Sequence, residues 1–89
     1  MNNSEDKAIS VRVLFFGGAK DITGTNSIEL SMSSPANLTD AKTLLIQKFP
    51  GLERFGRSLL FAVNQEYAAD TVLLDDGDEV AIFTAVSGG

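Results

Sequence analysis

Residues 9–16 read ISVRVLFF and run directly into Gly17-Gly18, and this stretch decides the fold. Its apolar residues recur at every second position, which is the period of a β-strand, and the two glycines end it. The same alternation returns over residues 27–32, SIELSM, after a loop or single turn at residues 20–24. We therefore expect residues 9–16 and 27–32 to form an antiparallel hairpin.

One helix is predicted after this hairpin. Asn37 can cap its first turn while Asp40 occupies the third helical position, a near relative of the capping box. The helix is expected to end at Pro50-Gly51 and to span about three turns, enough to cover one face of a small sheet. Its predicted apolar face holds Leu38, Ala41, Leu45 and Phe49, supported by Leu44. Its predicted water-facing residues are Lys42, Gln47 and Lys48.

Three short strands are predicted after the helix, over residues 59–63, 66–68 and 80–83, with turns at residues 64–65 and 75–78 between them. Two β units separated by one helix indicate an α+β fold, the β-grasp, in which a mixed sheet carries one main helix across one face. The first and last strands lie side by side in that topology. We therefore expect Phe16 and Phe83 to lie near one another.

The chain has 89 residues, which suits one small domain. We expect a disordered leader at residues 1–8, the β-grasp domain at 9–83 and a flexible Gly-Gly tail at 84–89. The N-terminus is polar, and the longest strongly apolar run, residues 59–63, is too short to cross a bilayer. The expectation is a cytosolic protein that makes no membrane contact.

Composition excludes several classes of function. The chain has no His and no Cys, which removes His-containing catalytic triads, thiol nucleophiles, CxxC redox motifs and zinc clusters. Its net charge is −5 with only seven Lys and Arg, which argues against nucleic-acid binding and favours a basic partner. We expect no metal and no permanently bound cofactor.

Two local motifs fail their tests. Residues 17–20, GGAK, are followed by Asp21, whereas a phosphate-binding P-loop needs Ser or Thr after the lysine. Gly17 and Gly18 are better explained by a tight exit from the strand at positive φ. The acidic turn at residues 75–78 does not match the calcium-loop template. It is either a solvated turn or a docking patch for a basic partner.

The last two residues, Gly88 and Gly89, are the strongest candidates for chemistry. An α-carboxylate on Gly89 would have no side chain to crowd its carbonyl carbon, and Gly88 would let the tail thread a narrow channel. A carboxylate is a poor electrophile, so it must first be activated, and an acyl-adenylate made from ATP is the plausible route. The alternative is a frayed end that happens to be glycine.

Three aromatic residues, Phe16, Tyr67 and Phe83, are not assigned to the core by the strand pattern. Strand alternation can turn each of them toward the face away from the helix, where together they would form an exposed apolar patch. The alternative is that some of them complete the core, because isolated surface aromatics are common. The pattern alone leaves both interpretations open.

Several stretches together resemble a known family: residues 11–16, 21–24, 61–67 and 77–83, and the end at 86–89. The chain resembles the small, sulfur-carrying subunit of molybdopterin synthase over nearly its whole length from residue 9. The resemblance implies a ubiquitin-like β-grasp that donates sulfur but is not itself the catalytic subunit. It departs from many members at Thr84-Ala85, where prolines are common and would hold the tail extended.

The same resemblance implies a mechanism. An activating enzyme would adenylate Gly89 with ATP and convert it to a thiocarboxylate. The large synthase subunit would then receive the tail and let it donate sulfur to cyclic pyranopterin monophosphate. The carrier at rest is expected to be a monomer or part of a heterotetramer with that subunit. The family's apolar contacts to its partners correspond to Phe16, Tyr67 and Phe83, with Val86 in the tail.

Other functions fit a β-grasp with a Gly-Gly end. One is a protein modifier joined through Gly89 to lysines of other proteins. Another is a sulfur carrier for thiamine synthesis or tRNA thiolation, which shares the activation chemistry and differs in the acceptor. A plain interaction domain with an inert tail is the last.

Overall fold

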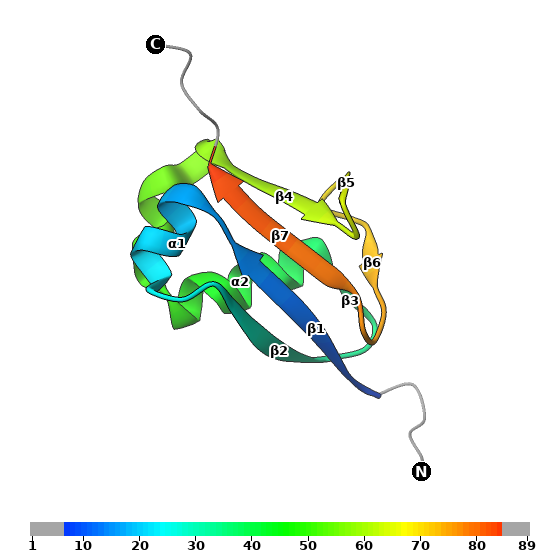
Figure 1. Ribbon diagram of the computed structural model, residues 1–89. Coiled ribbons are helices and arrows are strands. Elements are labelled where there is room, and N and C mark those ends of the chain that lie inside the picture. The colour runs from blue at the N-terminus through cyan, green and yellow to red at the C-terminus, as the bar shows by residue number, and fades with distance from the viewer. Residues whose placement is uncertain (1–6, 85–89) are drawn as a thin grey trace.

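The protein is a five-stranded mixed sheet with one long helix packed across one face (Figure 1). A computed structural model describes residues 7–84, apart from the side chain of Arg57. The strands are β1 (Ala8–Phe15), β2 (Ser27–Ser33), β3 (Ala36–Asn37), β4 (Leu59–Val63), β5 (Glu66–Tyr67), β6 (Leu73–Leu74) and β7 (Glu79–Thr84). The helices are α1 (Gly17–Thr23), α2 (Leu38–Lys48) and the 3₁₀ segment η1 (Pro50–Ser58).

The order of strands in the main sheet is β2-β1-β7-β4-β5. β1 pairs antiparallel with β2, as the predicted hairpin requires, and parallel with β7, so the first and last strands are neighbours as expected. Because Phe15 lies opposite Ile82, the C-terminal ends of the parallel strands β1 and β7 lie side by side (Figure 1). β1 begins at Ala8 and β7 ends at Thr84, so the sheet extends one residue past each end of the predicted range 9–83.

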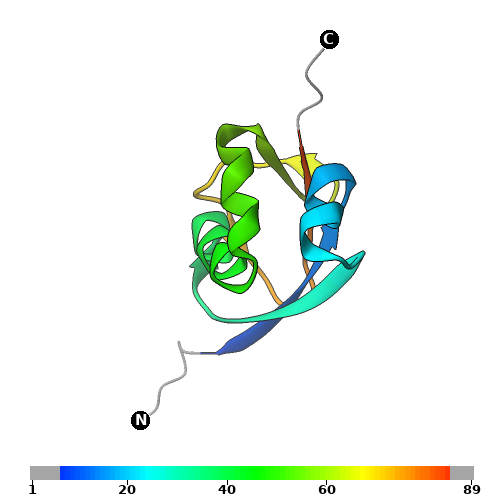
Figure 2. The same ribbon diagram turned by 90° about the vertical axis from the view of Figure 1, so that its left-hand side faces the viewer.

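The helix α2 begins at the predicted cap. The Asp40 amide donates to Asn37 Oδ1 at 3.0 Å, and the Asn37 amide donates to Asp40 Oδ2 at 2.9 Å, so both halves of the capping box are formed. α2 and η1 lie on one side of the sheet (Figure 2). The buried helix residues Leu38, Ala41 and Leu45 belong to the same core as the inward residues of β1 and β7.

A short helix, α1, stands where a loop was expected. Gly17 has the predicted positive φ, +55°, but Gly18 does not, and its role is different. A Cβ on Gly18 would lie 2.9 Å from Phe55 Cζ and 3.3 Å from Thr84 Cγ2, which is closer than carbon atoms pack. Gly18 therefore allows α1 to approach η1 and β7, and this packing, with Ala19 fully buried, stabilises a helix that local sequence disfavours.

Two further features were not predicted. β3 and β6, each two residues long, pair antiparallel to form a separate small sheet beside the N-terminus of α2. Lys42 was expected to face water, but its Nζ lies 5.0 Å from the centre of the Phe61 ring and 3.1 Å from Asp70 Oδ1. Its stem therefore lies over the core while its charge is paired at the surface.

Candidate functional site

The face of the sheet away from α2 carries a continuous apolar surface. Strand register places Leu14, Ala81, Ala62 and Tyr67 opposite one another in a row across β1, β7, β4 and β5. A second row, nearer the end of β7, has Phe83 opposite Leu60. Figure 1 views the sheet from this face, with α2 behind it. We call these six residues, together with Phe16 at the end of β1, the aromatic patch.

Phe16, Tyr67 and Phe83, which the sequence pattern did not assign to the core, differ in how far they are exposed. Tyr67 is 75% exposed and Phe16 is 50% exposed, whereas Phe83 is partly buried. The rings of Tyr67 and Phe83 lie 5.9 Å apart between centroids at an interplanar angle of 55°. None of the three belongs to the buried core cluster, so they do not complete the core.

The surface of the aromatic patch is recessed at its centre and raised at its margins. Ala62 is only 8% exposed although it faces away from α2, and it lies outside the buried core cluster. Small side chains at Ala62 and Ala81 flanked by the rings of Tyr67 and Phe83 make a shallow apolar surface of the kind found at the centre of protein interfaces.

A tight turn positions Tyr67 at the margin. Asn64 and Gln65 have φ values of 51° and 74°, the left-handed conformations that reverse a two-residue hairpin. The Asn64 side chain then bridges to the start of β7, donating to Asp78 Oδ1 and accepting from the Glu79 amide, both at 3.0 Å. This bracing holds β5, and with it Tyr67, against β4 and β7.

Backbone hydrogen bonds fix Phe16 at the opposite margin. Its amide donates to the Ile82 carbonyl at 2.9 Å, and its carbonyl accepts from the Ala19 amide at 3.1 Å as α1 begins. The chain reverses at Gly17, so the Phe16 side chain is left half exposed at the end of β1. Phe16 and Phe83 thus lie near the ends of adjacent strands, as expected. The aromatic ring that packs against Phe83 is that of Tyr67.

The C-terminal tail begins directly beside the aromatic patch. Thr84 is the last described residue of β7 and follows Phe83; it pairs with Leu59 and packs against Gly18 of α1. The predicted reactive residues Gly88 and Gly89, and the predicted contact residue Val86, lie outside the described residues. The structure therefore describes the surface from which residues 85–89 continue.

The acidic turn has a structural role of its own. Asp76 Oδ1 accepts from the Ser10 amide at 2.8 Å, and Asp78 Oδ2 accepts from the Asp75 amide at 2.8 Å. These carboxylates close the turn and attach it to β1. Among residues 7–84 no group of three or more His, Cys, Asp or Glu is placed to hold a metal ion. Within the same range no helix is long and apolar enough to cross a membrane.

Sequence reasoning missed the flat part of the aromatic patch: Leu14, Leu60, Ala62 and Ala81. Residues 59–63 read as a uniformly apolar strand, and nothing in that run separates the inward side chains from the outward ones. The signal that could have found them is the alternation itself. Once Phe61 and Ile82 are assigned to the core, their neighbours must face the other side.

Comparisons with known proteins agree with this geometry. Residues 13–89 match the model of the ThiS family. The chain is 30% identical over its full length to the molybdopterin synthase sulfur carrier subunit of Arabidopsis thaliana, of which it covers 93%. Its fold superposes on SAMP1, a small archaeal modifier protein of Haloferax volcanii, with a TM-score of 0.81 at 27% identity, covering 90% of this chain and 99% of that one.

A solved complex of subunits 1 and 2 of the molybdopterin-converting factor of Helicobacter pylori contains a similar fold. Its TM-score is 0.66 at 23% identity, with 91% of this chain and 100% of that one covered. These neighbours confirm the ubiquitin-like β-grasp. By the match over residues 13–89 and the full-length likeness to the plant subunit, the chain belongs to the ThiS family, among the sulfur carrier subunits of molybdopterin synthase.

Proposed function

We propose that the protein carries sulfur as a thiocarboxylate on Gly89 and donates it to cyclic pyranopterin monophosphate inside the large subunit of molybdopterin synthase. The observation that carries this proposal is the position of the aromatic patch, which ends at Phe83, one residue before β7 ends at Thr84 and the chain continues into residues 85–89. A partner that binds the patch receives the tail in the same encounter. Docking and delivery are thereby coupled.

The aromatic patch suits a partner that buries apolar surface. Tyr67 and Phe16 are large and exposed, and such residues anchor interfaces when a partner desolvates them. The large synthase subunit and the adenylating enzyme both have to receive the tail, so we propose that both bind this patch and exclude each other. The carrier then has to leave one partner before it can serve the other.

The length of the tail limits where each partner's active site can lie. Residues 85–89 are five in number, and five residues span at most about 18 Å when fully extended. The reacting atom of a bound partner must therefore lie within that distance of the end of β7. The same limit applies to the activating enzyme and to the synthase.

The chemistry needs a carboxylate on the carrier and catalytic groups on its partners. Attack of the Gly89 carboxylate on ATP forms the acyl-adenylate and releases pyrophosphate, and hydrosulfide-level sulfur then displaces AMP to leave the thiocarboxylate. The sulfur then forms a bond to a side-chain carbon of the pterin precursor as an oxygen substituent leaves that carbon, and water cleaves the acyl–sulfur bond and restores the carboxylate. The chain contains no His or Cys for these steps, so we assign the proton transfers to the partners.

ATP is accordingly a substrate of the activating enzyme in this proposal, and the carrier holds no cofactor of its own. We place the reactions in the cytosol.

Intact mass spectrometry tests the carrier function directly. The full chain is incubated with the host's activating enzyme, ATP and sulfide, and the expected result is the mass gain of one oxygen replaced by sulfur, localised to Gly89. A variant with one alanine added after Gly89 should show no gain, because the carboxylate is then on the wrong residue. Equal sulfur incorporation in both proteins would overturn the proposal.

The likeness to SAMP1 favours one alternative, a protein modifier. A modifier would form amide bonds from Gly89 to lysines of other proteins after the same adenylation. Adducts that survive reducing denaturing electrophoresis, with no pterin product when the large subunit is added, would support the modifier. Sulfur transfer to a thiamine precursor or to tRNA in place of the pterin would indicate the third class of acceptor.

A further inference from the structure

Among residues 7–84 no strand pairs with the outer side of β2, which therefore forms an open edge of the main sheet. Its pairing with β1 includes a hydrogen bond from the Phe15 amide to Asn26 O and another from the Ser34 amide to Lys7 O. Antiparallel ladders alternate, so the pairs between these two bonds that exchange hydrogen bonds are those of Ile28, Leu30 and Met32. The amides and carbonyls of Glu29, Ser31 and Ser33 therefore point outward from the edge.

This edge is unusually open for a natural sheet. The other edge strand, β5, is two residues long, whereas β2 has seven and contains no proline or lysine. Short edges, prolines and lysines are the usual devices that prevent a further strand from adding. The one charge on β2, Glu29, lies near Arg12 at 3.9 Å and accepts from the Ser10 hydroxyl, so it is directed onto the sheet and not across the edge.

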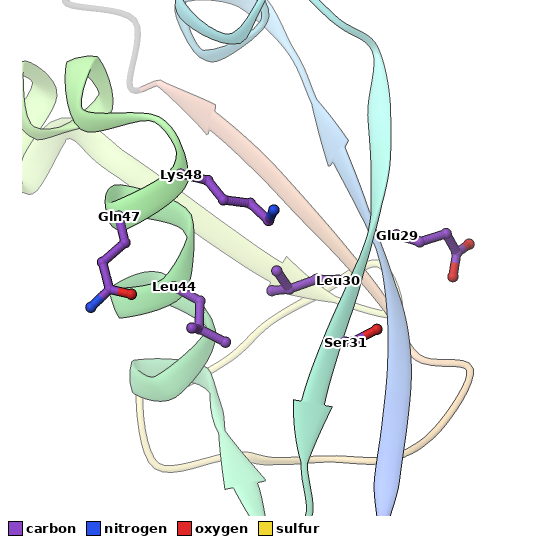
Figure 3. Close-up of a pocket in the computed structure, with 6 residues that line it drawn as sticks. All are labelled: Glu29, Leu30, Ser31, Leu44, Gln47 and Lys48. Atoms are coloured by element: carbon purple, nitrogen blue, oxygen red, sulfur yellow. The ribbon is translucent and has the colours of Figure 1, made fainter.

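A groove runs beside this edge, between β2 and α2. It contains two adjoining hollows of about 420 and 380 Å³ that share Leu44 of α2 as a wall. Leu30 closes the floor of the first and Met32 that of the second. In Figure 3 Leu30 and Lys48 reach toward each other across the gap, while Glu29 points away on the far side of β2. A strand added to β2 would turn alternate side chains into these hollows.

The groove has a charged end. Lys48 lines the first hollow, and no carboxylate of residues 7–84 lies within 4.0 Å of its Nζ. Asp40 lines the second hollow, but its carboxylate is already bonded to the Asn37 amide in the capping box. An occupant with an acidic residue at the Lys48 end would complement the unpaired charge.

A second copy of this chain does not fit as the occupant. The apolar side chains of β2 are Ile28, Leu30 and Met32. Leu30 and Met32 are 2% and 6% exposed in their own core, and Ile28 is packed against that core. Two copies that paired through β2 would leave the hollows of both unfilled. Each copy also carries a net charge of −5, which opposes self-association.

From these observations we propose that β2 and the groove beside it bind an extended segment of another protein as a sixth strand. The segment has apolar residues at alternate positions, which fill the two hollows, and an acidic residue at the end near Lys48. Strand addition of this kind takes its affinity from main-chain hydrogen bonds and its specificity from pockets for alternate side chains. The site is at the opposite edge of the sheet from Tyr67, so it is a second binding surface beside the aromatic patch.

The probe is a synthetic peptide, acetyl-DDVTITVS-amide, titrated into the full chain and followed by amide NMR spectra. We expect the amides of Glu29, Ser31 and Ser33 to shift and to gain protection from hydrogen exchange, and a scrambled peptide to leave them unchanged. Lys48→Glu should raise the Kd of the peptide by about fivefold, as for loss and reversal of an exposed ion pair. Lys20→Glu, the same charge change on α1, should leave it unaltered.

The backbone test uses a matched pair. Ser31→Pro removes one outward amide and should abolish binding, whereas Ser31→Ala should retain it. If Ser31→Pro unfolds, the two lysine variants decide the question. The proposal is overturned if the three β2 amides do not respond to the peptide, or if Lys48→Glu and Lys20→Glu bind it equally. Shifts at these amides that depend on protein concentration alone would show that a second copy is the occupant.

Discussion

Replacing Tyr67 by alanine should separate binding from stability more clearly than any other single change in the aromatic patch. Tyr67 is 75% exposed, so most of its surface is still available to a partner. An aromatic side chain buries about 150–250 Å² in all, so about 110–190 Å² remains to be covered on docking. At about 25 cal/mol/Å² that area corresponds to roughly 3–5 kcal/mol at most.

Alanine keeps a small part of that area, so we expect a loss of about 2–3 kcal/mol, a rise of about 30- to 150-fold in Kd. The stability of the free protein should change much less. The variant loses the tilted ring contact between Tyr67 and Phe83, whose centroids lie 5.9 Å apart, and such a pair contributes about 0.5–1.5 kcal/mol.

Calorimetric titration with the large synthase subunit measures the Kd, and urea unfolding measures the stability. Tyr67→Phe is the matched control, because it removes the hydroxyl and keeps the ring, and it should bind within about threefold of the native protein if the apolar area is what matters. An unchanged Kd for Tyr67→Ala with the fold intact would refute the assignment of this face as the docking surface. A loss in Tyr67→Phe as large as in Tyr67→Ala would refute the area argument.

Three further changes test how the fold supports the site. Gly18→Ala should lower the free energy of unfolding in urea by about 1 kcal/mol, because the clash of the added Cβ outweighs the gain in helix propensity. Lys20→Ala, on the exposed face of α1, is the control and should have little effect in the same urea titration. Asn37→Ala should cost about 1 kcal/mol in thermal unfolding by removing the cap of α2, and the double variant with Asp40→Ala should lose less than the sum of the two because the capping box is reciprocal. Asn64→Gly keeps the left-handed turn and loses the side-chain bonds, whereas Asn64→Ala loses both, so Asn64→Ala should be the less stable; equal stabilities would show that the turn is not strained.

The parts of the fold that the sequence predicts are those with a local signal. The alternation of apolar and polar residues predicted β1 and β2, and the pair Asn37 and Asp40 predicted the start of α2. Each of these signals is contained within a few neighbouring residues of the sequence. The neighbouring positions of β1 and β7 followed from the fold class, which the order of elements indicates. In each case local preference and the final packing agree.

The parts that could not be predicted depend on distant contacts. α1 contains two glycines and forms because Ala19 and Gly18 fit closely against the rest of the protein, which no local propensity records. β3 pairs with β6 although residues 38–72 lie between the two strands in the sequence. Lys42 lies over Phe61 because α2 turns that side of its surface toward β4, and a helical wheel cannot show a ring that comes from another element.

The same distinction holds for the candidate site. The exposed aromatic residues were identified as candidates because they did not fit the core, and the structure places Tyr67 and Phe83 in contact. The alanines between them carry no chemical signal, since Ala62 and Ala81 are equally ordinary in a core. Their side chains are small, and only the register across β7, β4 and β5 shows that they lie on the face of the sheet away from α2.

The position of β7 in the middle of the sheet has a mechanical consequence. In the proposed function the tail is withdrawn from a narrow active site, which would pull on β7 along the direction of the strand. β7 is hydrogen-bonded on both sides, to β1 and to β4, and these bonds lie across the strands and hence across the pull. They resist in shear and share the load, whereas an edge strand would peel away one bond at a time. In this proposal the tail can therefore be inserted and withdrawn repeatedly, and the protein released from its partner, without separating β7 from β1 and β4.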